Sequence, residues 1–207
     1  MYIPEFNRVE DRAVALAFMK ANPFAVLIST ADGVPFASHV PILAREVNGQ
    51  LRLRGHVAKA NPHWKSIHQD QESLVIFSGP HAYISPSLYE IHESVPTWNY
   101  AAVHAYGNGT VFTDPDQLNQ CLQELIAEFD ASYAAQWPSL SEQYRSRMVQ
   151  HIVGFEITAT RVETKFKLSQ NRTQAEQENI IKSLAGRPDS SAAAVAALMK
   201  DRGLGSR

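Results

Sequence analysis

The stretch from Gly79 to Gly107, GPHAYISPSLYEIHESVPTWNYAAVHAYG, constrains the fold most, because three prolines interrupt a segment rich in aromatic side chains. Proline removes a backbone donor and fixes φ, so a strand passes through Pro80, Pro86 or Pro96 only with difficulty. We therefore expect short strand pieces joined by shaped loops. The planar rings, hydroxyls, amide and imidazoles would suit a flat, partly polar ligand. The alternative is an ordinary core whose aromatic side chains find polar partners at its rim.

Composition is that of a globular protein and gives no general attraction to polyanions. The chain has 207 residues, 44% of them hydrophobic, which is enough for one large core. Its net charge of −2 would not draw it to nucleic acid or anionic lipid, so DNA binding would need a local basic face. The densest basic group is Arg161, Lys165, Lys167 and Arg172, which is sized for one ligand phosphate rather than a duplex.

Cysteine content and the N-terminal residues bear on the compartment. Cys121 is the only cysteine, so no intrachain disulfide or thiolate zinc site can form, which fits a reducing environment. The opening residues lack a basic region followed by a continuous apolar run, and no window reaches the length of a membrane span. We expect a soluble, cytoplasmic protein.

Apolar periodicity and turn residues predict a helix and then a series of strands in the first half of the chain. The expected elements are a helix at 9–21, strands at 24–30 and 35–43 around Asp32-Gly33, a strand at 51–55 after Asn48-Gly49, a helix at 60–68, a buried strand at 73–78 ended by Gly79-Pro80, and strand structure at 100–113.

The second half is predicted to contain helices and two further strands. Asp114-Pro115 begins a helix with one apolar face, and Cys121 beside that face is expected to be a packing residue. The remaining expected elements are a short helix at 141–147, two strands at 149–160 and 161–168, a helix with a capping box of Thr173 and Glu176, a last helix capped by Ser191, and a frayed tail at 203–207.

Several common chemistries have no motif in this chain. Neither GxGxxG nor GxxxxGK[ST] occurs, and HExxH is absent. His39, His56, His63 and His68 could converge on a metal, but none are four residues apart and no carboxylate partner is evident, so no metal site is expected. A serine triad stays open, although no nucleophile elbow marks any serine. The helix that follows Thr173 is too acidic for a recognition helix on DNA.

Lys59 is a candidate anion ligand. It precedes the helix expected at 60–68, where a helix dipole and an ammonium would favour the same charge. The alternative is a solvated surface lysine.

Four separated strings of the chain are uncommon: SHVP from Ser38, GHVAKANPHW from Gly55, GPHAYISPSLY with VPTWNYAAVHAYG from Gly79, and KLSQNR from Lys167. Read together with the opening MYIPEF, they resemble the PaiB family of FMN-binding negative transcriptional regulators. The resemblance implies a mainly β protein with peripheral helices (α+β). Its fold would be the split β-barrel of pyridoxamine-phosphate-oxidase-like flavoproteins. No repeat or linker divides the chain, so we expect one unit in which residues 1–170 bind FMN and 171–207 form a small helical extension. The resemblance also implies a homodimer with FMN at the subunit interface.

With this ligand in view, the residues expected to bind FMN come from both halves of the chain. They are Ser38, His39, Val40, Gly55, His56, Ala58, Lys59, Asn61, Trp98, Asn99, Lys167, Gln170, Asn171 and Arg172. No catalytic residue can be assigned. Trp98 has a second possible role as a dimer-interface anchor, and the two roles are compatible.

The sequence leaves two biological functions open. One is regulation, as the resemblance implies, although the charge does not favour direct DNA contact. The other is a flavin reductase or FMN-dependent oxidoreductase that uses NAD(P)H on a small molecule, with His39, His56 and His104 as candidate proton donors.

Overall fold

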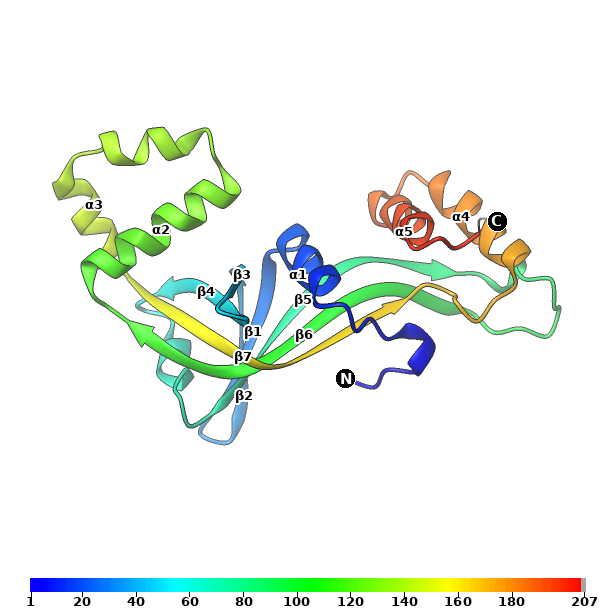
Figure 1. The fold of residues 1–207 in the computed structure, drawn as a ribbon, viewed down its shortest axis with the longest axis horizontal. Coiled ribbons are helices and arrows are strands. Elements are labelled where there is room, and N and C mark those ends of the chain that lie inside the picture. Colours follow the sequence, from blue (N-terminus) through cyan, green and yellow to red (C-terminus); the bar gives the residue numbers. More distant parts are fainter. Residues whose placement is uncertain (206–207) are drawn as a thin grey trace. The chain divides into compact units, whose positions relative to one another are not determined.

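The chain is dominated by one antiparallel sheet with helices around it (Figure 1). The computed structural model describes residues 1–205. The strands are β1 (Phe24–Ala31), β2 (Val34–Pro41), β3 (Leu43–Val47), β4 (Gln50–Ala58), β5 (Glu72–Ile84), β6 (Thr97–Phe112) and β7 (Ile152–Lys167). Their order in the sheet is β2-β1-β5-β6-β7-β4-β3, so β2 and β3 are the two ends of the list.

Five α-helices and five short 3₁₀-helices complete the described chain. The α-helices are α1 (Arg12–Ala21), α2 (Pro115–Phe129), α3 (Glu142–Val149), α4 (Gln174–Ala185) and α5 (Ser190–Asp201). The 3₁₀-helices are η1 (Glu5–Asn7), η2 (Pro62–Ser66), η3 (Pro86–Leu88), η4 (Tyr133–Ala135) and η5 (Trp137–Ser139). No α-helix of residues 1–205 combines the length and the apolarity needed to cross a bilayer.

The chain divides into two compact units. Unit 1 comprises Met1–Ala15, Ser78–Val103 and Glu163–Arg207, and unit 2 comprises Leu16–Phe77 and His104–Val162. Strands β5, β6 and β7 contribute residues to both. In unit 1, α5 packs on one face of the sheet, where Met199 contacts Asn99.

The two predicted tight turns form as their sequences require. Asp32 and Gly33 join β1 to β2 with φ of 50° and 78°, and Asn48 and Gly49 join β3 to β4 with φ of 52° and 75°. Positive φ at both central residues is the signature of a type I′ hairpin, which asparagine, aspartate and glycine tolerate best. Strand β4 also alternates buried and half-exposed residues, as its period of two predicts.

Helix α2 belongs to unit 2 and packs its apolar face against the rest of that unit. Asp114 accepts from the backbone N–H of Gln117 at 3.0 Å and starts the helix as predicted. Cys121 is fully buried with Leu43, Leu125 and Phe112 around it. Burial raises the pKa of the Cys121 thiol from 9.0 to about 11, so the residue is a packing group and a poor nucleophile, as expected.

Because the Cys121 thiol is buried, we expect the protein to lose stability at alkaline pH. The unfolded chain releases the Cys121 proton from about pH 9, whereas the folded protein holds it to about pH 11, so the free energy of unfolding falls as pH rises through that window. The loss attributable to this group approaches about 3 kcal/mol at the upper limit. Urea titrations at pH 8.5 and 10.5 measure it, and Cys121→Ala removes this increment. Equal pH dependence in both proteins would contradict the assignment.

The stretch around the prolines differs from prediction. Strand β5 does not end at Gly79-Pro80 but continues to Ile84, and β6 is one strand of 16 residues rather than several pieces. The pairing of β1 with β5 covers only Leu74 to Ile76, so Pro80 lies beyond the ladder on that side. The backbone groups of His81, just after Pro80, form hydrogen bonds with a side chain. The Ser191 hydroxyl accepts from His81 N–H and donates to His81 C=O.

Two other elements also differ from their predictions. The strands expected at 149–160 and 161–168 are the single strand β7. The helix expected at 60–68 is only the five-residue η2, whose first turn is capped by the Asn61 side chain. A single 3₁₀ turn has almost no macrodipole, so the helix-dipole argument for an anion beside Lys59 is lost.

The C-terminal residues are more ordered than predicted. Helix α4 has its capping box of Thr173 and Glu176, but α5 is capped by Asp189, not Ser191. After α5, the N–H of Gly203 bonds to Lys200 C=O and that of Leu204 to Met199 C=O, with φ of 72° at Gly203. This is a Schellman motif, which fixes the tail that was expected to fray. Ser206 and Arg207 lie outside the described residues.

Candidate functional site

Three polar side chains of unit 2 form a hydrogen-bonded cluster between β2 and η2. The Asn61 amide donates to Ser38 Oγ at 3.0 Å, and Ser38 Oγ lies 2.8 Å from Nδ1 of His63. The ring of Phe36 meets the His63 imidazole edge to face, with centroids 5.0 Å apart. His63 is only 1% exposed, so the cluster is held inside the protein.

The role of the Ser38 hydroxyl decides the tautomer of His63. When Ser38 Oγ accepts from Asn61 and donates its own proton to Nδ1 of His63, the ring proton lies on Nε2. Nε2 of His63 is buried and has no hydrogen-bond partner among residues 1–205. A buried polar atom without a partner costs about 1–3 kcal/mol, so a ligand group that bonded to this nitrogen would remove that cost.

Two imidazoles of unit 2 are held neutral by burial. Burial lowers the pKa of His56 and of His63 below the ordinary value of 6.5. Nδ1 of His56, on β4, is also buried without a partner among the described residues. Both rings therefore stay uncharged near neutral pH.

Because His56 and His63 are neutral in the folded protein, we expect its stability to fall at acid pH. Below pH 6.5 the unfolded chain binds protons that the folded histidines resist, so the free energy of unfolding falls as pH falls through that value. Thermal unfolding measured from pH 7.5 to pH 5 should show a falling midpoint. The double variant His56→Gln with His63→Gln should show a shallower fall, and an unchanged slope would exclude these two groups as its cause.

The other predicted residues of unit 2 differ in their accessibility. His39, Ala58 and Lys59 are exposed, and the Lys59 C=O accepts from the Trp64 indole at 3.1 Å. Val40 is 6% exposed and belongs to the core. Gly55 is buried, and a Cβ there would lie 2.9 Å from the Phe155 ring and 3.0 Å from Pro41 C=O. Val40 and Gly55 are thus packing residues with no polar side-chain group to offer a ligand.

In unit 1, aromatic and lysine side chains of β5, β6 and β7 lie near one another, exposed at Trp98 and buried at Lys165. Trp98 is 52% exposed, with the rings of His81 and Tyr83 6.0 and 5.9 Å from it. Lys165 lies 5.3 Å from the Tyr100 ring. Lys167 donates to the Thr97 hydroxyl. Burial is the main cause of a lowered pKa at Lys167, with the neighbouring charge of Lys165 adding to it and Tyr100 opposing it.

The residues after Lys167 hold the C-terminal helices in place. Asn99 is fully buried, accepts from Ser169 Oγ at 3.0 Å and lies against Met199. Ser169 itself has a φ of 64°, a strained value for a residue with a side chain. These contacts fasten the end of β7 to β6 and to α5.

Gln170 and Arg172 bind neighbouring segments in the same way. The Gln170 side chain accepts from Leu168 N–H at 2.8 Å and donates to Phe166 C=O. Arg172 stacks on the Tyr89 ring at 3.6 Å and pairs with Glu176 at 3.8 Å. Asn171 between them is exposed.

The structure therefore brings some of the predicted residues into direct contact, in two separate groups. Ser38 and Asn61 touch in unit 2, as do Asn99 and the segment beginning at Lys167 in unit 1. His63 also lies in the Ser38–Asn61 cluster, although its sequence indicated only a possible metal ligand. Its signal was the string Asn-Pro-His, in which an asparagine side chain caps the turn that positions the histidine. Residues 1–205 hold no group of three or more metal-ligating side chains.

The chain matches known sequences along most of its length. Residues 1–161 match the family described as "Putative FMN-binding domain". The protease synthase and sporulation protein PAI 2 of Bacillus subtilis is 34% identical over 204 residues, which cover 98% of each chain.

Solved structures share the fold at low sequence identity. The flavocytochrome Anf3 from Azotobacter vinelandii has a TM-score of 0.62 and 16% identity, over 80% of this chain and 72% of its own. The FAD and heme binding protein from Mycobacterium smegmatis has a TM-score of 0.58 and 14% identity, over 78% of this chain and 73% of its own.

The family match and the PAI 2 identity extend over enough of the chain to decide its family, and the structural likenesses bear on the fold alone. The chain belongs to the PaiB family of FMN-binding proteins, has a split β-barrel fold, and takes FMN as its cofactor.

Proposed function

We propose that Ser38, Asn61 and His63, together with Lys59, hold the phosphate of FMN. The observation that carries this proposal is the buried Nε2 of His63, which has no hydrogen-bond partner among residues 1–205 and to which we assign the ring proton. A phosphate carries close to two negative charges and several acceptor oxygens, so it suits a buried imidazole donor and the ammonium of the exposed Lys59. His39, His56 and Ala58 complete the proposed site in unit 2, with Val40 and Gly55 as its packed support.

The protein is further proposed to be a homodimer with FMN at the subunit interface. FMN, when bound, supplies a ring system that accepts electrons or a hydride. The aromatic cluster around Trp98 in unit 1 supports a partner protomer there, since clustered exposed aromatic side chains are typical of interfaces. Trp98, Lys167 and Asn171 are the exposed or half-exposed residues proposed to reach the flavin. Asn99, Gln170 and Arg172 would act by holding their segments in place.

Substitution of Lys59 tests the phosphate assignment. Lys59→Ala should weaken FMN binding by roughly 1–3 kcal/mol, the scale of one charge-assisted hydrogen bond. Titration of the apoprotein with FMN measures the change. The matched control is Lys65→Ala, because Lys65 is an exposed lysine of η2 whose ammonium lies over the Trp64 ring. Equal FMN affinities of both variants and the wild type would mean that the phosphate binds elsewhere.

A mixed-dimer experiment tests the shared interface. If one FMN site uses His63 of one protomer and Trp98 of the other, His63→Phe and Trp98→Ala homodimers each have only damaged sites. A heterodimer formed by co-expression has one undamaged site. The mixture should therefore recover FMN absorbance that neither parent retains after gel filtration, whereas a site built within a single protomer would recover none.

The biological output is proposed to be regulatory, with the protein acting in the cytoplasm as a negative transcriptional regulator of the PaiB type. The relative PAI 2 is named a protease synthase and sporulation protein. Anaerobic mixing with NADH or NADPH should leave the flavin oxidised, and a gel shift at moderate salt with the gene's own promoter should show specific retardation. Rapid bleaching of the flavin by NADH or NADPH, without retardation of the promoter DNA, would indicate a flavin reductase instead of a regulator.

A further inference from the structure

The backbone of Lys59 is held by hydrogen bonds on both sides of its side chain. Its N–H donates to His151 C=O at 2.7 Å, and its C=O accepts from the Trp64 indole N–H at 3.1 Å. Asn61 N–H donates to Ala58 C=O at 2.8 Å, which closes a β-turn around Lys59. The exposed Lys59 side chain therefore projects from a backbone that is fixed before any ligand arrives.

Trp64 makes its bond from η2, the short helix that also carries His63. At the start of this helix the Asn61 side chain accepts from His63 N–H at 3.1 Å, and its amide donates to Ser38 Oγ at 3.0 Å. The Trp64 indole thus connects the helix of the buried His63 to the turn of the exposed Lys59. A ligand that meets both side chains depends on the spacing that this bond helps to set.

The indole N–H can be removed without removing the aromatic ring. Trp64 is half-buried, and the Lys65 ammonium lies 5.6 Å from its ring centroid. Phenylalanine keeps a ring for such contacts but has no N–H donor. The bond to Lys59 C=O is exposed to solvent, so its loss should disturb the group that it orients more than the fold as a whole.

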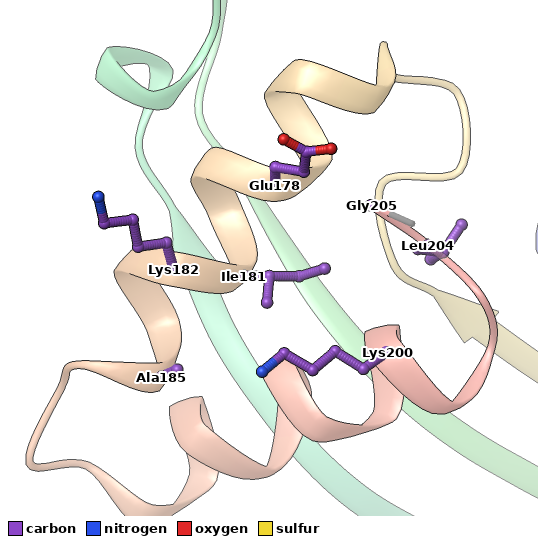
Figure 2. A pocket seen from close by; sticks show the side chains of 7 residues that line it. All are labelled: Glu178, Ile181, Lys182, Ala185, Lys200, Leu204 and Gly205. Atoms are coloured by element: carbon purple, nitrogen blue, oxygen red, sulfur yellow. The ribbon is translucent and has the colours of Figure 1, made fainter. Parts of the chain in front are cut away.

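A groove in unit 1, between α4 and α5, provides a lysine for comparison (Figure 2). Its volume is about 630 Å³, and the exposed Lys200 lines it together with Glu178. None of the seven described residues that line it is aromatic, so no ring there would stack on a flavin. In Figure 2 the Lys182 side chain points away from the groove. Lys200→Ala therefore removes an exposed charge from a surface with no feature of a flavin site.

We propose that Trp64 is a positioning residue that orients Lys59 toward the phosphate of FMN and so sets the preference for FMN over riboflavin. Riboflavin is the same flavin without the phosphate. This inference rests on the proposed function, in which Lys59 and the His63 cluster hold the phosphate. Trp64 acts through Lys59, so its effect is confined to the part of the binding that riboflavin lacks.

Titration of the apoprotein with FMN and with riboflavin tests this role. Trp64→Phe should bind FMN roughly three- to tenfold more weakly, the scale of one net hydrogen bond, at unchanged riboflavin affinity. Riboflavin binding also reports that the variant is folded, because general damage to the site would weaken both flavins alike. Lys200→Ala should match the wild type with both flavins. An unchanged ratio of the two affinities in Trp64→Phe would overturn the proposal.

A double-mutant cycle then shows whether Trp64 acts through Lys59. In a Lys59→Ala background, Trp64→Phe should cause no further loss of FMN affinity, because the ammonium that it orients is already absent. Additive losses would overturn the positioning role while leaving the phosphate assignment intact. Unchanged FMN binding by Lys59→Ala alone would overturn both, so the two failures are distinguishable.

Discussion

Replacement of His63 by phenylalanine is expected to weaken FMN binding roughly 10- to 100-fold. The change keeps a ring of similar size against Phe36 but removes the Nε2–H donor proposed to meet the phosphate. A hydrogen bond to a charged group contributes about 1.5–3 kcal/mol, and each 1.4 kcal/mol is a factor of ten in affinity. FMN titration of the purified apoprotein measures the effect.

The controls separate a lost ligand from a damaged fold. His63→Phe also leaves the Ser38 hydroxyl without its acceptor, so the free energy of unfolding should fall by about 1–3 kcal/mol. His63→Gln retains an N–H donor and should recover part of the affinity. If His63→Phe folds and binds FMN like the wild type, the phosphate does not lie at this cluster.

Gly107→Ala is expected to lower the free energy of unfolding by about 3 kcal/mol or more. A Cβ on Gly107 would overlap the backbone carbonyl oxygen of Thr158 and lie 2.9 Å from Ala159 Cα, both on β7. Backbone atoms of a paired strand cannot swing aside as a flexible side chain can, so the strands must separate. Urea unfolding at constant m-value measures the loss.

Gly186→Ala is the matched glycine control. Gly186 caps α4 with a φ of −86°, and its nearest neighbour to an added Cβ is Lys182 C=O at 3.6 Å. Alanine fits such a position and restricts the unfolded chain, so a change between zero and a gain of about 1 kcal/mol is expected. Equal stability of Gly107→Ala and Gly186→Ala would mean that β6 and β7 do not approach so closely at Gly107.

The local elements of this fold were predictable from short stretches of sequence. The turns at Asp32-Gly33 and Asn48-Gly49, the start of α2 at Asp114 and the capping box at Thr173 all formed as expected. Each depends on a few adjacent residues whose side chains satisfy nearby backbone groups. The family was also evident from sequence, because its longest motifs are uncommon strings.

Predictions failed where distant residues decided the outcome. Strand β5 passes Pro80 because β1 no longer pairs there and Ser191, 110 residues away from His81 in the chain, satisfies the backbone. The tail after α5 is ordered because Gln177 on another helix accepts from Gly205. Neither partner can be identified from the local pattern.

The sequence by itself determined the family, the cofactor, the fold class and the tight turns, because these follow from local strings and from backbone preferences of single residues. Only the tertiary structure showed that Ser38, Asn61 and His63 form one cluster, and that the buried Asn99 joins β6 to Ser169 and Met199. The physical reason is that a hydrogen bond between distant residues depends on which strands and turns come together, and burial then decides whether its polar atoms remain available to a ligand.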